Sequence, residues 1–352
     1  MGLICKLMDD PKNTDMAGLS IFAAIICWPW PSTTLDSFAI TAQSNLGVRI
    51  ILVSKSSPSL LLRLAPALFV AIWSTGWVSA RYGADYADPL TFLSARFVLA
   101  FAAMLVIIGF SRAEWPKGRG ILHAMMSGVL LHALYLGGVW WAIAHGVPTG
   151  ISGLVAAIQP ILTAFLAPLI LRERIGPLQW AGIFLGFAGI VFVLEPKLSV
   201  IDPAHLAETL EPLAINMLAM VSVTFGTFYQ KRFIPKGDLR TVTALQYAGA
   251  FIVVTPAALL LEPLRLDWGL PLIAVMAWSV LALSLGAIGL LLLLIREGAV
   301  SRAAALIYLV PPSVAIEAWI AFGETMQIVQ LVGLGLTVLG VALATRRPGM
   351  PK

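Results

Sequence analysis

Ten apolar stretches of about 20 residues each follow one another along this chain, and they restrict its fold more than any other feature. Wound as an α-helix at 1.5 Å per residue, such a stretch crosses the roughly 30 Å hydrocarbon core of a bilayer. A helix also satisfies its own backbone hydrogen bonds, which lipid cannot do. We therefore expect an all-α integral membrane protein. The predicted transmembrane helices span residues 64–80, 89–110, 121–144, 149–171, 177–194, 213–230, 241–261, 271–295, 300–322 and 327–345.

The charge content argues against a soluble protein and against a nucleic-acid partner. Only 12% of the residues are charged and 59% are apolar, whereas a soluble domain carries about 25% charged residues. A net charge of +5 would suggest nucleic acid if it formed a basic patch. The Lys and Arg residues lie instead in short loops between the apolar stretches, so the expected partner is the lipid bilayer.

The positive charges also predict how the helices are oriented. With residues 1–63 placed in the cytoplasm, 19 of the 23 Lys and Arg fall in loops on that side. Three, namely Arg81, Lys197 and Arg265, fall on the other side, and Arg96 falls within a span. Cytoplasmic loops are rich in Lys and Arg, so both termini are predicted to be cytoplasmic. A missed or an extra span would scramble this distribution, which supports a count of ten.

The two halves of the chain resemble each other at an offset of 150 to 152 residues. Matching pairs include Gly76 and Gly226, Thr91 and Thr241, Pro160 and Pro312, Glu173 and Glu324, and Gly189 and Gly340. Each half holds five spans. Because five is odd, the second copy enters the membrane from the opposite side, which predicts two inverted five-helix repeats. Inverted repeats are characteristic of secondary transporters, whose site lies between them.

The predicted domain boundaries follow from this duplication. The repeats cover residues 64–195 and 213–345, and residues 346–352 form a cytoplasmic tail. Residues 1–60 lie outside the repeat, and we expect a disordered extension or an artefactual one with the true start further along. The apolar run 17–30 is short for a span and leaves a signal segment open.

Several short motifs recur in a fixed order. They are Trp73-Ser74-Thr75-Gly76-Trp77, Pro89…Arg96-Phe97, Pro160…Glu173, Pro312…Glu324, Gln179-x-x-Gly182 and Gln330-x-x-Gly333. With these motifs and the duplication, residues 64–345 resemble the EamA-type permeases of the drug/metabolite transporter superfamily. The resemblance implies a bacterial inner-membrane protein that exports or exchanges amino acids, metabolites or drugs. It also implies a central cavity between two four-helix groups, with the fifth and tenth helices outside. One departure is Gln246, which stands where the first half has Arg96.

Two ionisable residues lie deep within spans and are candidates for transport. Arg96 is predicted roughly 10 Å and Glu317 roughly 7–8 Å below the outer end of its span. A charge at the bilayer centre costs on the order of 2.5–3.5 kcal/mol, so both should face protein or water. Arg96 either contacts an anionic or zwitterionic substrate or locks carbonyls of a neighbouring helix. In one hypothesis Glu317 either pairs with Arg96 or lines the same outward cavity, where it could carry a coupling proton. In the alternative its side chain reaches the outer interface.

Polar and aromatic residues within the spans are further candidates for the cavity. The predicted lining residues are Trp73, Thr75, Arg96, Tyr135, Gln159 and Tyr308. Pro160 and the pair Pro311-Pro312 are predicted to interrupt two matching helices, either at the binding site or only to shape the helix. Small-residue faces at Gly182, Gly186 and Gly189, and at Gly333, Gly335 and Gly340, are interpreted as packing or dimer surfaces, so a homodimer stays open.

These features predict a secondary transporter rather than an enzyme. The transporter would move a small metabolite, amino acid or drug across the cytoplasmic membrane by alternating access, as an exporter. The alternative is a membrane-embedded enzyme acting on a lipid-linked substrate, but the spans lack clustered acid and base residues. Two cysteines ahead of the bundle and four scattered histidines give no metal-ligand spacing, and no cofactor is expected. The substrate, the direction of transport and the coupling ion stay open.

Overall fold

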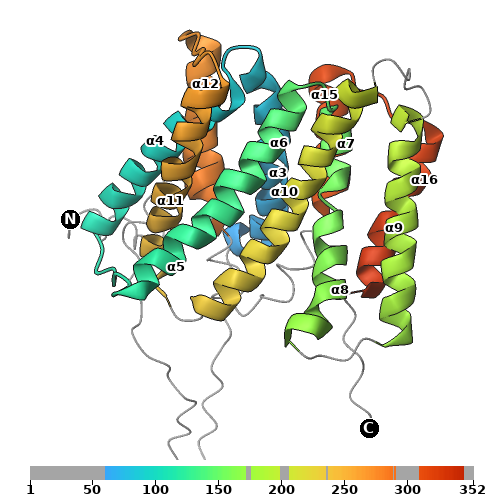
Figure 1. Cartoon of the computed structure of the whole chain (residues 1–352), viewed down its shortest axis with the longest axis horizontal. Coiled ribbons are helices and arrows are strands. Elements are labelled where there is room, and N and C mark those ends of the chain that lie inside the picture. The colour runs from blue at the N-terminus through green and yellow to red at the C-terminus, as the bar shows by residue number, and fades with distance from the viewer. Residues whose placement is uncertain are drawn as a thin grey trace, which may run out of the picture.

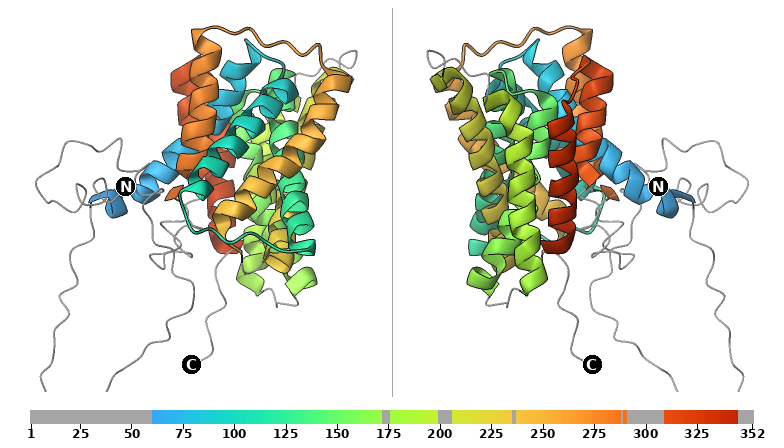
Figure 2. Two further views of the ribbon diagram at one scale, coloured as in Figure 1. Left: turned by 90° about the vertical axis from the view of Figure 1, so that its left-hand side faces the viewer. Right: turned by 90° about the vertical axis from the view of Figure 1, so that its right-hand side faces the viewer.

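The computed structural model describes residues 60–171, 176–198, 206–234, 237–287, 289–290 and 309–344. Within these ranges the chain is helical, apart from short loops and one isolated antiparallel bridge between Ala87 and Leu266. The predictions for residues 1–59, Glu173, Tyr308 and the tail lie outside the described residues. The helices form one bundle (Figures 1 and 2).

The helices divide between the two halves of the chain. The first half contains α3 Leu60–Ala84, α4 Pro89–Gly109, α5 Arg119–Gly128, the π-helix η1 Val129–Leu134, α6 Tyr135–Ala144, α7 Thr149–Val155, α8 Ile158–Leu171 and α9 Pro177–Leu198. The second half contains α10 Leu206–Phe233, α11 Leu239–Leu261, α12 Leu270–Trp278, the π-helix η3 Ser279–Gly286, α15 Val310–Phe322 and α16 Ile328–Ala344. The spans predicted over 271–295 and 300–322 are described only up to residue 290 and from residue 309.

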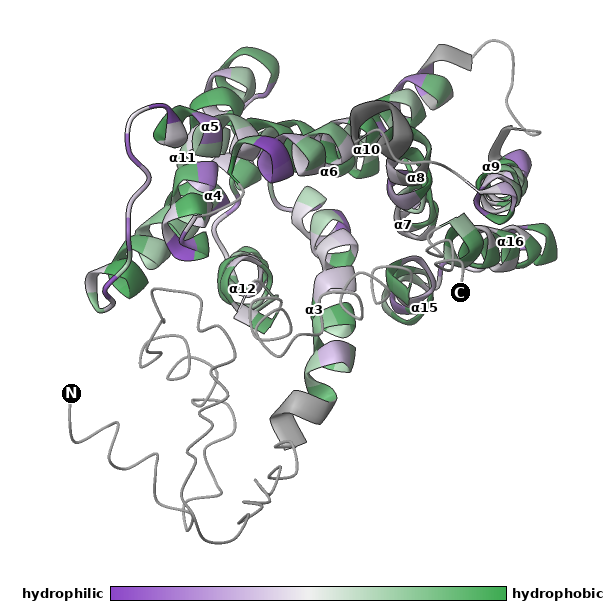
Figure 3. Ribbon diagram, turned by 90° about the horizontal axis from the view of Figure 1, so that it is seen from below, coloured by the Kyte–Doolittle hydropathy of each residue, from purple (hydrophilic) through white to green (hydrophobic). Residues whose placement is uncertain are grey.

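Five described helical stretches are long and apolar enough to cross a membrane. They are Pro89–Gly109, Arg119–Ala144, Pro177–Pro196, Leu210–Phe233 and Leu239–Leu261. Large apolar side chains point outward from the bundle, among them Leu260, Leu270 and Ile328, each at least 80% exposed. Hydrophobic residues, green in Figure 3, run along most of the helices. Apolar surface on this scale suits contact with lipid rather than with water.

Helices α9 and α16 lie side by side at one edge of the bundle (Figures 1 and 3). Their glycines bring the two backbones into contact: a Cβ on Gly182 would lie 2.6 Å from the carbonyl oxygen of Gly340, and one on Gly189 would lie 2.6 Å from that of Gly333. These glycines pack inside the chain, which favours the packing interpretation over a dimer surface. Gly335 differs, because a Cβ there would meet nothing within 4 Å.

The glutamines of the two Gln-x-x-Gly motifs form the same pair of hydrogen bonds at opposite ends of this helix pair. Gln179 accepts a hydrogen bond from the backbone N–H of Gly176 at 2.8 Å and donates to the carbonyl of Ala344 at 3.3 Å. Gln330 accepts a hydrogen bond from the backbone N–H of Gln327 at 2.9 Å and donates to the carbonyl of Val193 at 3.3 Å. Each glutamine therefore joins the start of its own helix to the end of the other, so α9 and α16 are antiparallel.

Helices α4 and α11 are joined in a similar reciprocal way. The carboxylate of Glu262, just after α11, accepts from the backbone N–H groups of Leu90 and Thr91 at 2.8 Å each, and from the Thr91 hydroxyl at 2.8 Å. At the other end, the hydroxyl of Thr241 donates to the carbonyl of Glu114, just after α4, at 2.8 Å. Acidic groups suit helix N-termini, whose N–H groups lack partners. The matched residues Thr91 and Thr241 thus occupy equivalent places.

Candidate functional site

Two π-helical turns lie at matching positions in the two halves. The first, η1, begins at Val129, and η3 begins 150 residues later at Ser279. A π-helical turn is rare and often occurs at a functional site. The turns end at Leu134 and Gly286, which are 152 residues apart because η3 is two residues longer, and this second offset pairs His132 with Ser284. The sequence pattern did not predict these two π-helical turns. A π-helical turn contains one extra residue, and this leaves the apolar run of the transmembrane helix uninterrupted.

Arg96 reaches from α4 to the second of these turns. The guanidinium donates from Nε and from Nη2 to the hydroxyl of Ser284, at 3.2 Å each. The side chain is 6% exposed, and the guanidinium carbon lies 5.9 Å from the ring centre of Trp140. No carboxylate of the described residues forms an ion pair with it. The contact is therefore to a hydroxyl of the opposite half, not to helix carbonyls.

The equivalent place in the second half is held by Gln246. Its amide donates to the hydroxyl of Ser127 at 3.0 Å and to the side-chain oxygen of Gln230 at 3.3 Å. The next residues of the two helices, Phe97 and Tyr247, stack on each other with ring centres 6.2 Å apart. The offset of 150 residues pairs Phe97, which follows Arg96, with Tyr247. The sequence repeat could therefore have identified Tyr247 as a residue at the centre of the bundle.

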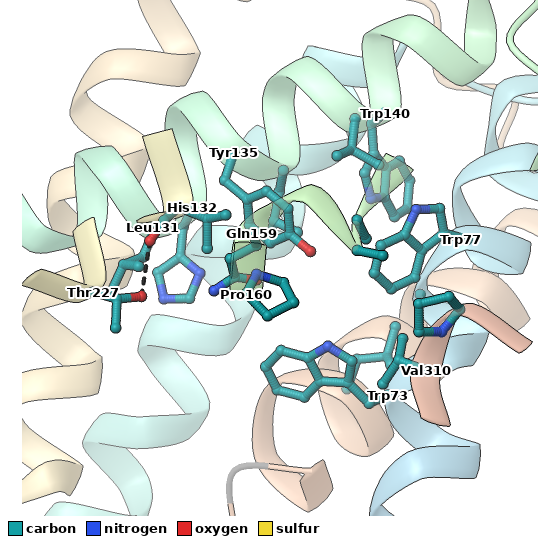
Figure 4. Close-up of a pocket in the computed structure, with 18 of the residues that line it drawn as sticks. Trp73, Trp77, Leu131, His132, Tyr135, Trp140, Gln159, Pro160, Thr227 and Val310 are labelled. Carbon is teal, nitrogen blue, oxygen red and sulfur yellow. Dashed lines mark hydrogen bonds between the residues drawn. The ribbon is translucent and has the colours of Figure 1, made fainter. Parts of the chain in front are cut away.

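A cavity of about 400 Å³ lies at this centre. Both halves of the chain line it, and six of the predicted residues are among those that do: Trp73, Arg96, Tyr135, Gln159, Pro160 and Pro311. Figure 4 shows three tryptophans, Trp73, Trp77 and Trp140, at one side of the cavity, with His132 and Thr227 at the other. No Asp or Glu is among the described residues that line it. The cavity is thus largely aromatic and apolar, with one permanent positive charge.

Several polar groups of this cavity have no protein partner. Among the described residues, no hydrogen bond is formed by the hydroxyl of Tyr135 or by the side-chain amide of Gln159, and the buried indole N–H of Trp77 is also without a partner. Thr227 differs, because its hydroxyl donates to the carbonyl of Val223 at 2.8 Å. Unpaired polar groups around a small cavity are typical of a ligand site.

The prolines lie where helices begin. Helix α7 ends at Val155 and α8 begins at Ile158, so the break comes just before Pro160. Ala156 and Ala157, at the break, also line the cavity. Pro311 and Pro312 lie in the first turn of α15, and only Pro311 lines the cavity. The residues just ahead of Leu309 are outside the described part of the chain.

Glu317 and Thr75 lie next to the cavity rather than in it. One carboxyl oxygen of Glu317 is 2.6 Å from the hydroxyl of Ser74, and the other is buried without a hydrogen-bond partner. The structure does not bring Glu317 and Arg96 together as an ion pair. The hydroxyl of Thr75 accepts from the indole N–H of Trp278 at 2.9 Å, which joins α3 to α12. In the described part of the chain, no group of three or more His, Cys, Asp or Glu could hold a metal ion.

Comparison with known families decides the class of this protein. The model of the EamA-like transporter family matches residues 61–195 and again residues 212–346. The chain belongs to this family. It is therefore a membrane transporter, an EamA-type permease of the drug/metabolite transporter superfamily, and a multi-pass inner-membrane protein with a duplicated family domain.

Individual relatives agree with the family. The chain is 28% identical over 291 residues to the uncharacterized inner membrane transporter YedA of Escherichia coli K12, covering 81% of this chain and 91% of YedA. It is 25% identical over 286 residues to a probable amino-acid metabolite efflux pump of Salmonella typhimurium LT2, covering 78% and 91%. A solved crystal structure at 20% identity shares the fold, with a TM-score of 0.58 over 81% of this chain and 96% of that one.

Proposed function

We propose that this permease is a secondary transporter that exports a small molecule by alternating access between two inverted five-helix repeats. The observation that carries the proposal is the central cavity, which is lined by both halves and flanked by equivalent π-helical turns. Inverted repeats favour alternating access because each half can adopt the conformation of the other. The antiparallel pairing of α9 with α16 and the reciprocal contacts of α4 with α11 support the inverted arrangement.

The extent of the cavity supports an inward-open conformation. With the predicted orientation, the lining residues Leu239 and Val341 lie at the cytoplasmic ends of α11 and α16. Toward the outside the lining stops at Trp77 and Trp140, one to two helical turns below the ends of α3 and α6. In this conformation an exported substrate would enter from the cytoplasm, and its release to the outside would require the cavity to open at the opposite end.

We propose Glu317 as the proton-binding group that couples this export to the proton gradient. The Ser74 hydroxyl has one hydrogen and lies within hydrogen-bonding distance of three oxygens: the carbonyls of Val70 and Ala71, at 2.9 and 3.1 Å, and Glu317. A carbonyl only accepts, so a protonated Glu317 that donates to Ser74 would satisfy more of these contacts than an ionised one. Proton release would then follow separation of α3 from α15.

The proposed function is tested in two steps. Growth of overexpressing and deletion strains on a panel of metabolites and drugs identifies candidate substrates, and uptake into proteoliposomes then measures flux. We expect saturable flux of an unmodified compound. Chemical turnover of a lipid-linked compound without flux would instead favour a membrane-embedded enzyme.

A further inference from the structure

We infer that the substrate is an organic monoanion with a flat, apolar body, whose carboxylate binds Arg96, rather than a zwitterionic amino acid. The inference rests on the proposed function, because it treats the central cavity as the transport site. It follows from the charge, the hydrogen-bonding groups and the shape of that cavity.

The charge of the cavity calls for an anion. An arginine side chain stays protonated in proteins, and Arg96 is buried without an acidic partner among the described residues. Its two hydrogen bonds both go to the hydroxyl oxygen of Ser284, which leaves three of its five N–H groups for another acceptor. A buried, unpaired charge is unfavourable, and a carboxylate pairs with a guanidinium through two parallel hydrogen bonds.

In the described part of the chain, the same cavity offers no carboxylate to pair with an ammonium ion. No Asp or Glu lines it among the described residues, and Glu317 bonds Ser74 outside it. The ammonium of an amino acid would have to lie near Arg96 without a counter-charge. The second half supplies Gln246 instead of another arginine, which favours one negative charge over two.

The walls of the cavity fit a flat apolar body. Trp140 stacks on Phe92 with ring centres 4.7 Å apart, which holds the indole in place. Trp73 and Trp77 line the same side (Figure 4), so an aromatic or planar group between them would make extensive contact. The unpaired hydroxyl of Tyr135 and amide of Gln159 can then bond one polar substituent. A volume of about 400 Å³ matches a small molecule.

Three probes with one ring and different charges test the inference directly. Phenylacetate is an anion, phenylalanine a zwitterion and phenethylamine a cation. Their binding to the purified full-length protein in nanodiscs is measured by calorimetry and by quenching of tryptophan fluorescence. We expect phenylacetate to bind at least tenfold more tightly than phenylalanine, and phenethylamine to bind most weakly.

Two variants assign this preference to Arg96. Arg96→Gln, which installs the residue type of the second half, should weaken phenylacetate binding at least tenfold and should not weaken the binding of phenethylamine. Arg81→Gln is the matched control: Arg81 is partly exposed, pairs with Asp85 and does not line the cavity, so binding should be unaltered.

Equal or tighter binding of phenylalanine by the unmodified protein would overturn the inference, and so would binding of none of the three probes. Unchanged phenylacetate affinity in Arg96→Gln would also overturn it. Because the probes are compared on the unmodified protein first, the result stands even where a variant does not fold. Selective binding of phenylacetate without flux in liposomes would contradict the proposed function alone, whereas flux of a zwitterion would contradict this inference alone.

Discussion

The two halves of this permease share a scaffold but differ in the chemistry of their centres. Gln179 and Gln330 form equivalent hydrogen bonds at the two ends of the α9–α16 pair. At the cavity, however, Arg96 of the first half is matched by Gln246 of the second. The repeated residues thus hold the helices together, while Arg96, which is not repeated, gives the cavity its charge.

The proposed proton site shows the same asymmetry. Ser74 corresponds to Thr224 at the offset of 150, and each hydroxyl lies 2.7–2.9 Å from the carbonyl four residues earlier. Of the two hydroxyls, only that of Ser74 also contacts a carboxyl group, that of Glu317. The residue equivalent to Glu317 in the first half, at the offset of 152, is Phe165, which has no carboxyl group. In this proposal a symmetric scaffold carries one anion site and one proton site.

The largest effect is expected from moving the positive charge between the halves. Arg96→Gln should reduce flux of an anionic substrate about 100-fold, because it removes the charged contact to the carboxylate. Each tenfold loss corresponds to about 1.4 kcal/mol of that contact. Adding Gln246→Arg should restore part of that flux, because the cavity again contains one cation. Initial rates in proteoliposomes measure both. No recovery in the double variant would mean that the position of the charge matters as well as its presence.

Removing the proposed proton site should abolish coupling but not binding. With Glu317→Gln, we expect substrate flux to be equal with and without a proton gradient across the vesicle membrane, whereas the unmodified protein should respond several-fold. Glu208→Gln, at an exposed acid near the start of α10, is the control and should retain the response. A gradient response that survives in Glu317→Gln would exclude this residue as the coupling group.

The glycine contacts between α9 and α16 should have an intermediate effect on stability. A Cβ at Gly189 would press on the carbonyl of Gly333, so Gly189→Ala should lower the free energy of unfolding by roughly 1–3 kcal/mol. Gly335→Ala, where a Cβ meets nothing within 4 Å, should cause no loss. Thermal unfolding in detergent compares the two variants, and equal losses would argue against close packing of these helices.

The smallest effect tests whether the scaffold is truly equivalent in the two halves. Gln179→Ala and Gln330→Ala each remove one pair of hydrogen bonds, so each should reduce stability by roughly 0.5–1.5 kcal/mol. The two losses should agree within experimental error. A large difference would show that one half contributes more to this helix pair than the other.

Much of the helical framework could be predicted from the sequence, because lipid requires long apolar runs and short polar loops. Helix ends were less predictable: the span expected over 213–230 lies within the longer α10, Leu206–Phe233, whose polar ends extend the apolar run. The repeat and the cavity residues Arg96, Tyr135 and Gln159 followed from patterns of residue type. The contact of Ser74 with Glu317 could not be predicted, because it joins residues 243 positions apart.

The central claim, that the two repeats are inverted, is tested most directly by labelling equivalent positions. Arg81 at the end of α3 and Lys231 at the end of α10 are separated by the repeat offset of 150. In a background with Cys5 and Cys27 replaced by serine, Arg81→Cys and Lys231→Cys are exposed to a membrane-impermeant maleimide in intact cells. The account predicts that Cys at 81 is labelled from outside and Cys at 231 only after permeabilisation. Labelling of both from the same side would contradict it.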